Sequence, residues 1–175
     1  MDHAGFSTNY VVNEFIFKSE FVFRDFKDQI TRENPFAPII VNQEDYGILS
    51  LGLEYLTEHA SGAETNLIFE GQSLLFVERN LREGVIPFQR DLLLGLRHSL
   101  NDVAGREFFF SIIADVEFQK EILASVKYSQ RFGENWKGQL GLRYIDAPPS
   151  TPFDTSGLRS LHKDHQLDMS LTRYF

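Results

Sequence analysis

The sequence contains no cysteine in its 175 residues, so disulfide bonds and thiolate metal sites are excluded. It also has no run of about eighteen apolar residues, which excludes a membrane-spanning helix. The net charge is -8 and the pI is about 5.1, whereas a protein that neutralises phosphates needs a basic surface. No phosphate loop, glycine-rich dinucleotide turn or HExxH pattern is present. We therefore expect no nucleic-acid partner and no cofactor.

The chain is nevertheless rich in aromatic residues, with 17 phenylalanines, although its mean hydropathy of -0.24 is that of a soluble protein. Apolar residues that occupy every second position of β-strands explain both values. Three such segments follow one another between residues 107 and 145. Their apolar positions are Phe108, Phe110, Ile112, Ala114, Val116 and Phe118, then Ile122, Ala124, Val126 and Tyr128, then Trp136, Leu140, Leu142 and Tyr144. This alternation predicts an antiparallel β-meander with one apolar and one polar face.

The register of this meander follows from the rule that paired strands keep their apolar residues on one side. Three-residue turns at 119–121 and 133–135 satisfy that rule. The predicted pairs are Asp115 with Ser125, Ser125 with Arg143, and Phe132 with Trp136. The first two pairs predict a charge-complementary ladder across three strands. The third predicts an aromatic girdle at a membrane interface.

The whole chain, residues 1–175, is predicted to be one β-domain of about eight strands. The expected strands are 10–27, 45–58, 66–79 with a bulge near Gly71, 88–100, 107–118, 122–132, 136–146 and 164–175. The connections 28–44, 81–87 and 147–163 would lie on one side, and the shorter 59–64, 101–105 and 133–135 on the other. This asymmetry is typical of outer-membrane barrels. The expected fold is an all-β, antiparallel, up-and-down transmembrane β-barrel, or the C-terminal part of a larger barrel.

The last strand resembles the C-terminal strand of bacterial outer-membrane barrels, which ends on an aromatic residue after alternating apolar positions. The matching residues, a candidate assembly signal, are Leu167, Met169, Leu171 and Phe175. Arg173 departs from that pattern, and the aromatic expected there is displaced to Tyr174. The resemblance implies recognition by the barrel-assembly machinery, outer-membrane lipid and lipopolysaccharide as surroundings, and no obligate protein partner. The chain starts without a signal peptide, so we expect a mature form or a fragment.

A narrower resemblance connects the chain to the C-terminal half of uncharacterised proteobacterial outer-membrane proteins. It is carried by the segments Pro87-Phe88-Gln89-Arg90-Asp91, Gly95-Leu96-Arg97, Leu100-Asn101-Asp102 and Leu171-Thr172-Arg173-Tyr174-Phe175. It implies that the chain is the C-terminal part of a larger barrel in a Gram-negative envelope. It carries over no catalytic or ligand residue.

The polar face is the candidate functional surface. The charged residues expected to line the lumen are Glu20, Arg24, Glu54, Asp91, Arg97, Asp115, Glu117, Lys127, Arg131 and Arg143. In an eight-stranded barrel these charges would pair across a narrow, plugged interior. In a wider barrel they would line a polar conduit. The sequence predicts a structural or passive, porin-like transport role without catalysis.

Three alternatives remain open at this stage. His98 and Ser99 suggest a hydrolase, but alternation places them on opposite faces of one strand. His162 and His165, with Asp164 and Asp168, could bind a metal, although a solvated loop rim is the simpler interpretation. A soluble lipocalin-like barrel for a small hydrophobic ligand would show the same alternation. Small residues on the polar face favour the membrane barrel, because crowding inside a barrel selects them. These residues are Ser50, Gly52, Gly95, Ser99, Ser111, Ser125, Ser129, Gly141 and Ser170.

Overall fold

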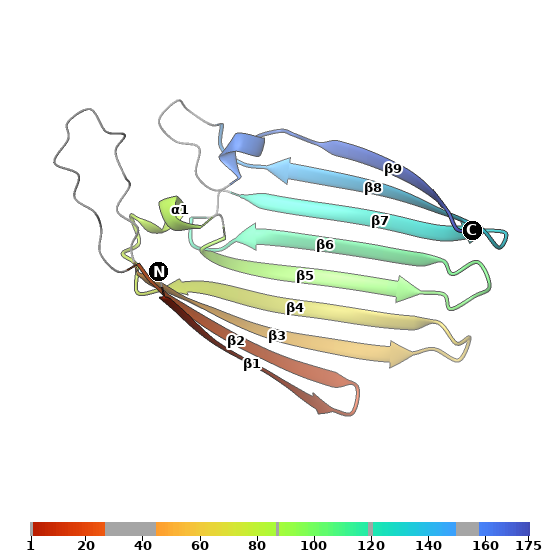
Figure 1. Cartoon of the computed structure of the whole chain (residues 1–175), viewed down its shortest axis with the longest axis horizontal. Helices are drawn as coiled ribbons and strands as arrows, with labels where there is room; N and C mark the ends of the chain where they lie inside the picture. The colour runs from red at the N-terminus through yellow and green to blue at the C-terminus, as the bar shows by residue number, and fades with distance from the viewer. Residues whose placement is uncertain (1, 27–44, 87, 119–120, 150–157) are drawn as a thin grey trace.

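The computed structural model describes residues 2–26, 45–86, 88–118, 121–149 and 158–175. It is an all-β protein built from a single nine-stranded sheet, in which each strand pairs antiparallel with the next strand in sequence (Figure 1). The strands are β1 (Asp2–Val12), β2 (Phe15–Asp25), β3 (Tyr46–Glu58), β4 (Glu64–Leu75), β5 (Arg90–Ser99), β6 (Glu107–Asp115), β7 (Ile122–Phe132), β8 (Trp136–Asp146) and β9 (Gln166–Arg173). A short helix α1 (Arg82–Val85) and a 3-10 turn η1 (Arg159–Leu161) complete the described elements. The sheet is curved but not closed into a barrel.

The expected first strand, 10–27, is wrong, because β1 and β2 replace it. The chain reverses at Asn13 and Glu14, and Asn13 has a left-handed φ of 51°. Asparagine tolerates this conformation better than other residues that carry a side chain. No glycine or proline marks the turn, so the sequence pattern did not reveal it. The remaining seven predicted strands each overlap one observed strand.

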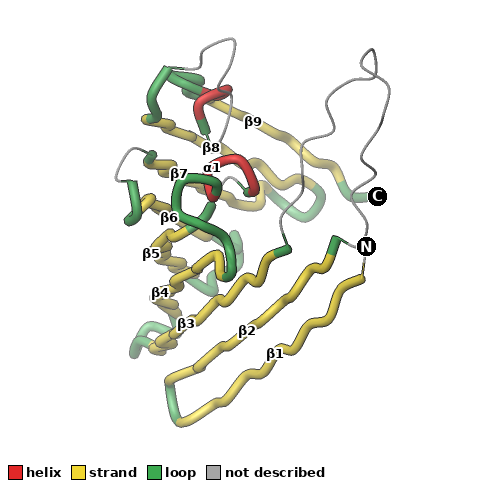
Figure 2. Tube along the Cα trace, turned by 90° about the vertical axis from the view of Figure 1, so that its left-hand side faces the viewer, coloured by secondary structure: helices red, strands yellow, loops and turns green. Residues whose placement is uncertain are grey.

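The two faces of the sheet differ in curvature and in chemistry. Figure 2 shows α1 inside the curve of the sheet, and its Val85 packs with Leu74 of β4, which places Leu74 on the concave face. Because side chains alternate along a strand, Ser73 and Leu75 lie on the convex face. Paired residues of neighbouring strands lie on the same face, so the pairing and the alternation together assign every strand residue to a face. The predicted apolar face is convex and the predicted polar face is concave.

The register between β6 and β7 differs from the prediction by four residues. Strand β6 ends at Asp115, whose carboxylate accepts hydrogen bonds from the backbone N–H groups of Glu117 (2.9 Å) and Phe118 (3.1 Å). These bonds form a local turn that competes with continuation of the strand. Ser125 therefore lies opposite Ser111 and not opposite Asp115. The shift is an even number of residues, so each side chain keeps its predicted face.

The bulge expected near Gly71 is also wrong, because β4 pairs without interruption with both neighbours. The bulge was expected because β4 has apolar residues on both faces. The burial of Leu74 explains its place on the polar face. Leu74 is fully buried and packs with Tyr46 and Val77 in a cluster at one end of the concave face. A second cluster at the same end contains Ile145, Ala147 and Leu158. The concave face is thus polar along its middle and apolar at one end, where loop segments cover it.

The connections are divided between the two ends of the sheet, as Figure 1 shows. The short turns 59–63, 100–106 and 133–135 lie at one end, which we call the short-turn end. The described residues 76–86, 88–89, 147–149 and 158–165 lie at the other, the loop-rich end, together with residues 116–118 after β6. This confirms the predicted arrangement where the residues are described. The connection 28–44 and residues 150–157 lie outside the described residues.

Candidate functional site

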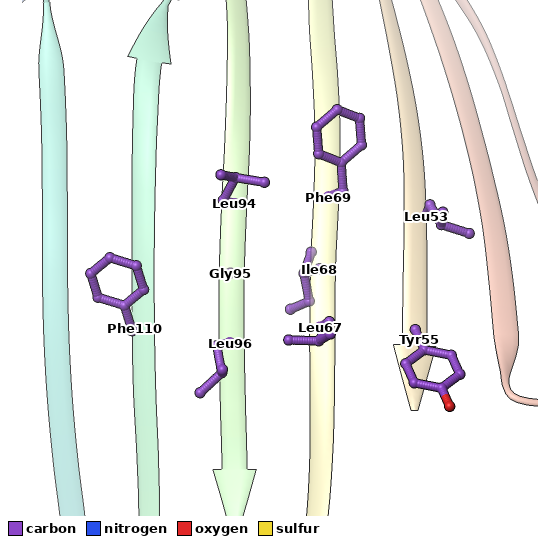
Figure 3. Close-up of a pocket in the computed structure, with 9 residues that line it drawn as sticks. All are labelled: Leu53, Tyr55, Leu67, Ile68, Phe69, Leu94, Gly95, Leu96 and Phe110. Carbon is purple, nitrogen blue, oxygen red and sulfur yellow. The ribbon is translucent and has the colours of Figure 1, made fainter. Parts of the chain in front are cut away.

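The convex face is an extended apolar surface that no part of the described chain covers. Leu51, Leu94 and Leu142 lie near its middle and are each more than half exposed, although all three are large and apolar. A shallow groove of about 460 Å³ crosses it between β3 and β6, with almost wholly apolar walls (Figure 3). Its wall on the convex side consists of Leu53, Tyr55, Leu67, Phe69, Leu94, Leu96 and Phe110. An exposed apolar surface of this kind is typical of a binding or membrane-contact surface.

Charged residues are confined to the edges of this convex surface. Within the described strands, the residues with formal charge on the convex face are Asp2, Asp25, Arg90, Asp146 and Arg173. Each of them is the first or last residue of its strand. The convex face therefore carries a continuous belt without charge, bounded by Asp2, Asp25, Arg90 and Asp146 at the loop-rich end and by Arg173 at the short-turn end.

Aromatic residues mark the short-turn end of this belt. Phe132 lies opposite Trp136, as the sequence predicted. Arg173 takes the convex position where the assembly-signal pattern expects an aromatic residue. Its guanidinium carbon lies 5.6 Å from the centre of the Trp136 ring and 5.0 Å from that of Phe175, within the range of cation–π attraction. Of the candidate assembly-signal residues, Leu167, Met169 and Leu171 are exposed on the convex face of β9, and Phe175 is exposed beyond its end.

The concave face holds nine of the ten predicted polar residues. They are Glu20, Arg24, Glu54, Asp91, Arg97, Asp115, Lys127, Arg131 and Arg143. The tenth, Glu117, is not in a strand, because β6 ends two residues before it. The nine small residues noted in the sequence also lie on the concave face. Whether these groups line a lumen stays a prediction.

Several of the concave charges form a polar band near the short-turn end. The two carboxylate oxygens of Glu54 accept separate hydrogen bonds, one from Lys18 and one of 3.1 Å from Asn66. Asn66 lies opposite Arg97 in the pairing of β4 with β5. Arg97 in turn donates two hydrogen bonds of 2.6 and 3.0 Å to one oxygen of Glu107. Two ion pairs, Lys18 with Glu54 and Arg97 with Glu107, therefore lie in this band between β2 and β6.

The predicted ladder of Asp115, Ser125 and Arg143 is wrong in its first member. Ser111 takes the place of Asp115, and its hydroxyl lies 2.7 Å from that of Ser125. Ser125 lies opposite Arg143, as predicted. Arg143 hydrogen-bonds with Gln166 of β9, which the sequence reasoning missed. The error came from the length of the turn after β6, which the pattern does not specify.

The correct register exposes a pair of like charges that the sequence analysis also missed. Asp91 and Asp115 lie directly opposite each other on β5 and β6, and both side chains are buried. Asp115 is satisfied by the backbone of its own turn. The Oδ2 atom of Asp91 is buried without a hydrogen-bond partner among the described residues. Like charges opposite one another destabilise a sheet, so this pair needs other contacts to hold it in place.

The other polar motifs in the sequence do not come together as sites. His98 lies on the convex face, where its Nδ1 atom is 2.9 Å from the hydroxyl of Thr65, whereas Ser99 lies on the concave face and bonds to Asn101. The described residues contain no group of three or more histidine, aspartate or glutamate side chains that could hold a metal, so His162 and His165 form no such site. Outside the sheet, the backbone N–H and the side chain of Arg106 lower the pKa of Asp102.

These observations define the class as an antiparallel, up-and-down β-sheet protein with an apolar convex face and a polar concave face. Comparisons with protein-family models, curated proteins and solved structures found no match. Across the described ranges, no helix has the length and apolar character to cross a bilayer.

Proposed function

We propose that the chain forms the wall of a bacterial outer-membrane β-barrel, with a structural or passive, porin-like transport role and no catalytic activity. The observation that carries this proposal is the distribution of charge on the convex face, where every charged strand residue lies at a strand end. A lysine or arginine at the middle of a bilayer costs about 2–4 kcal/mol on the lipid face of such a barrel, and an aspartate or glutamate costs less. The cost falls close to zero at the interfaces, which matches these positions.

The curvature supports the same proposal over a lipocalin-like carrier. A soluble barrel that binds a hydrophobic ligand places apolar residues on its concave face and polar residues toward water. This sheet has the opposite arrangement, with Leu94 on the convex face and Ser50 and Gly52 on the concave one. Lipid chains and lipopolysaccharide acyl chains would cover the convex face and fill its grooves. In the bilayer the sheet edges would be paired, because unpaired backbone groups are costly in hydrocarbon.

The C-terminal residues supply the argument for the outer membrane in particular. The alternation of Leu167, Met169 and Leu171 toward the terminal Phe175 fits recognition by the barrel-assembly machinery during insertion. Arg173 does not prevent this, because its guanidinium lies against two aromatic rings in place of an aromatic side chain.

A single spin label at each face tests the proposal. The chain has no cysteine, so Leu94→Cys and Ser50→Cys each provide one labelling site, on the convex and concave faces respectively. After reconstitution into phospholipid vesicles, the label at position 94 should collide with dissolved oxygen and be shielded from a water-soluble nickel complex. The label at position 50 should show the reverse. A protein that stays in buffer as a monomer, with position 94 accessible to the nickel complex, would be a soluble barrel.

A further inference from the structure

The segment between β4 and β5 crosses the concave face at the loop-rich end, and we call its residues 76–86 the plug. Val77, Val85 and Ile86 of the plug pack on Tyr46 and Leu74, two buried side chains of the concave face. Hydrogen bonds from β4 also hold the chain between β4 and β5. Gln72 donates a hydrogen bond of 2.7 Å to the carbonyl of Phe88, and the backbone N–H of Leu74 donates one of 2.6 Å to Gln89. The plug therefore lies over the apolar, loop-rich end of the concave face and not beside it.

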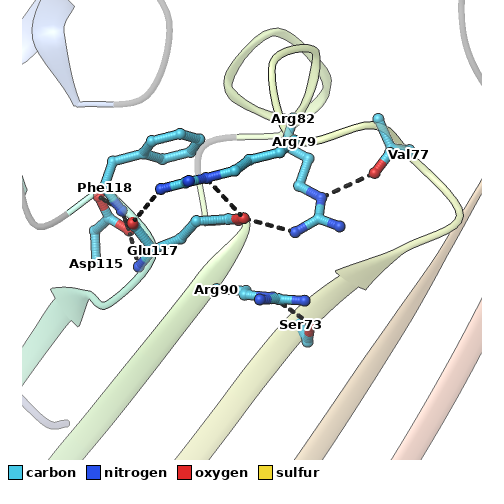
Figure 4. Close-up of polar contacts among 8 residues, drawn as sticks. All are labelled: Ser73, Val77, Arg79, Arg82, Arg90, Asp115, Glu117 and Phe118. Atoms are coloured by element: carbon cyan, nitrogen blue, oxygen red, sulfur yellow. Dashed lines mark hydrogen bonds and ion pairs between the residues drawn. The ribbon is translucent and has the colours of Figure 1, made fainter.

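The carboxylate of Glu117 connects the plug to the chain that follows β6, at the same end of the sheet (Figure 4). The Oε1 atom of Glu117 lies 2.7 Å from Arg82 Nη1 and 3.6 Å from Arg79 Nε. Arg79 also donates a hydrogen bond of 3.2 Å to the backbone carbonyl of Glu117, and its guanidinium lies over the ring of Phe118. Both arginines belong to the plug, whereas Glu117 follows β6. We call these contacts the latch.

The burial of the latch makes it a strong contact that depends on charge. The side chains of Glu117 and Arg82 are only 4 % and 14 % exposed, whereas that of Arg79 is 69 % exposed. A buried ion pair whose partner is removed leaves an uncompensated charge, which is strongly unfavourable. The Oε2 atom of Glu117 has no hydrogen-bond partner in the described structure. The carboxylate is thus held by its ion pairs and not by a fixed network of backbone donors.

The backbone at the start of the plug is held in an unfavourable conformation. Phe76, the first residue after β4, has a φ of 68°, which is an outlier for a bulky side chain. Its ring lies on the convex side against Phe23 and over Gly47, while the chain continues to the concave side. Strain of this kind persists only where surrounding contacts impose it. Loss of the latch would remove one of those contacts.

We propose that residues 76–86 are a latched plug, which the ion pairs of Glu117 with Arg79 and Arg82 hold closed over a path for small polar solutes along the concave face. This inference rests on the proposed function and decides its open point, because it makes the interior a closed conduit and not a permanently filled core. The polar band of the concave face begins beyond the plug, where Lys18, Glu54 and Asn66 present hydrogen-bonding side chains in place of apolar ones.

The latch can be tested through two fully buried residues of the concave face. Leu74 lies under the plug, and Ile145 is buried in the separate cluster that it forms with Ala147 and Leu158. Leu74→Cys and Ile145→Cys therefore give single thiols that react with a water-soluble thiol reagent only when their covers open. Glu117→Lys places a third positive charge at the latch. In vesicles, it should speed labelling at position 74 by at least about tenfold and leave position 145 unchanged.

A charge exchange separates the latch from simple misfolding. Adding Arg82→Glu to Glu117→Lys restores one ion pair with reversed charges, and it should return the labelling rate at position 74 toward that of the parent protein. Asp102→Ala is the matched control, because it removes an ion pair with Arg106 in a turn at the other end of the sheet. It should leave both rates unchanged. Faster labelling at both positions 74 and 145 would mean general unfolding and would overturn the latch.

The path itself is tested by the permeability of the same vesicles to a small neutral sugar. Glu117→Lys should raise the rate of sugar efflux, and the charge-exchanged variant should lower it again. If position 74 labels faster but efflux does not change, the plug covers no path and the inference is wrong. If Glu117→Lys changes neither labelling nor efflux while the label at position 94 reports lipid, the inference is wrong but the proposed function stands. A label at position 94 that reports water would instead overturn the proposed function.

Discussion

The side-chain hydroxyls of Ser111 and Ser125 lie 2.7 Å apart across β6 and β7, in the row that also contains Arg143. Ser111 is buried, so the bond is shielded from water. Two small hydroxyl groups fit where the strands face the inside of the curve. The predicted register would have placed the carboxylate of Asp115 here, opposite Ser125 and one strand away from Arg143.

This pair of hydroxyls should behave as a coupled unit in unfolding experiments. Ser111→Ala and Ser125→Ala each break the bond and should each lower the free energy of unfolding by about 1 kcal/mol. The double variant should cost clearly less than the sum, because the second substitution removes a group that the first left without its partner. Denaturant titrations of the four proteins in detergent or vesicles measure the coupling.

Asp115 and Arg143 supply the contrasting case. They belong to different rows of the observed register, since Asp115 lies opposite Asp91 and Arg143 lies opposite Ser125. The effects of Asp115→Asn and Arg143→Gln should therefore add within about 0.5 kcal/mol. Strong positive coupling between them would mean that β6 and β7 pair in the register first expected from the sequence.

The two halves of the polar band should differ in their contribution to stability. The side chain of Glu54 is 15 % exposed, and each of its carboxylate oxygens has a partner. Glu54→Gln weakens both contacts and should cost about 1–2 kcal/mol. Arg97 is 56 % exposed, and water screens its ion pair with Glu107. Arg97→Gln should cost less than about 1 kcal/mol. An equal or larger loss for Arg97→Gln would contradict this ranking.

Gly95 and Gly71 provide a matched test of crowding on the two faces. A Cβ atom at Gly95 would lie 3.2 Å from the Cβ of Ile68, which cannot move without the backbone of β4. A Cβ atom at Gly71 would meet only the end of the Leu92 side chain at 3.3 Å. We expect Gly95→Ala to lower the free energy of unfolding by about 1–3 kcal/mol and Gly71→Ala to change it little. Similar effects at both glycines would show that the concave face is no more crowded than the convex one.

The contact of Arg173 with Trp136 can be followed directly, because the chain has one tryptophan. Arg173→Leu replaces a charged neighbour of the indole with an apolar one. It should shift the tryptophan emission of the reconstituted protein to shorter wavelength and cost about 0.5–1 kcal/mol of stability. Lys137→Leu is the control, because Lys137 adjoins Trp136 in sequence but lies on the other face of the sheet. An identical shift in both variants would mean that Arg173 does not lie against the indole.

The sequence alone determined the strand type and, for β3 to β9, which residues of each strand share a face. A side chain changes face at every residue, so the alternation of Phe108, Phe110 and Ile112 with polar neighbours gives the two faces without any knowledge of the turns. The pairing of Phe132 with Trp136 was also predictable, because glycine and asparagine mark the intervening turn.

Only the tertiary structure decided the register across β6 and β7, the division of residues 10–27 into two strands, and the position of the plug. Each of these depends on where the chain reverses. The carboxylate of Asp115 caps its own turn, and Asn13 adopts a left-handed conformation without an adjacent glycine or proline. Hydrophobic alternation is insensitive to a register shift of two or four residues, because the same faces stay together. The contacts of Glu117 with Arg79 and Arg82 therefore lay beyond the sequence pattern, since they join two connections that are 35 or more residues apart.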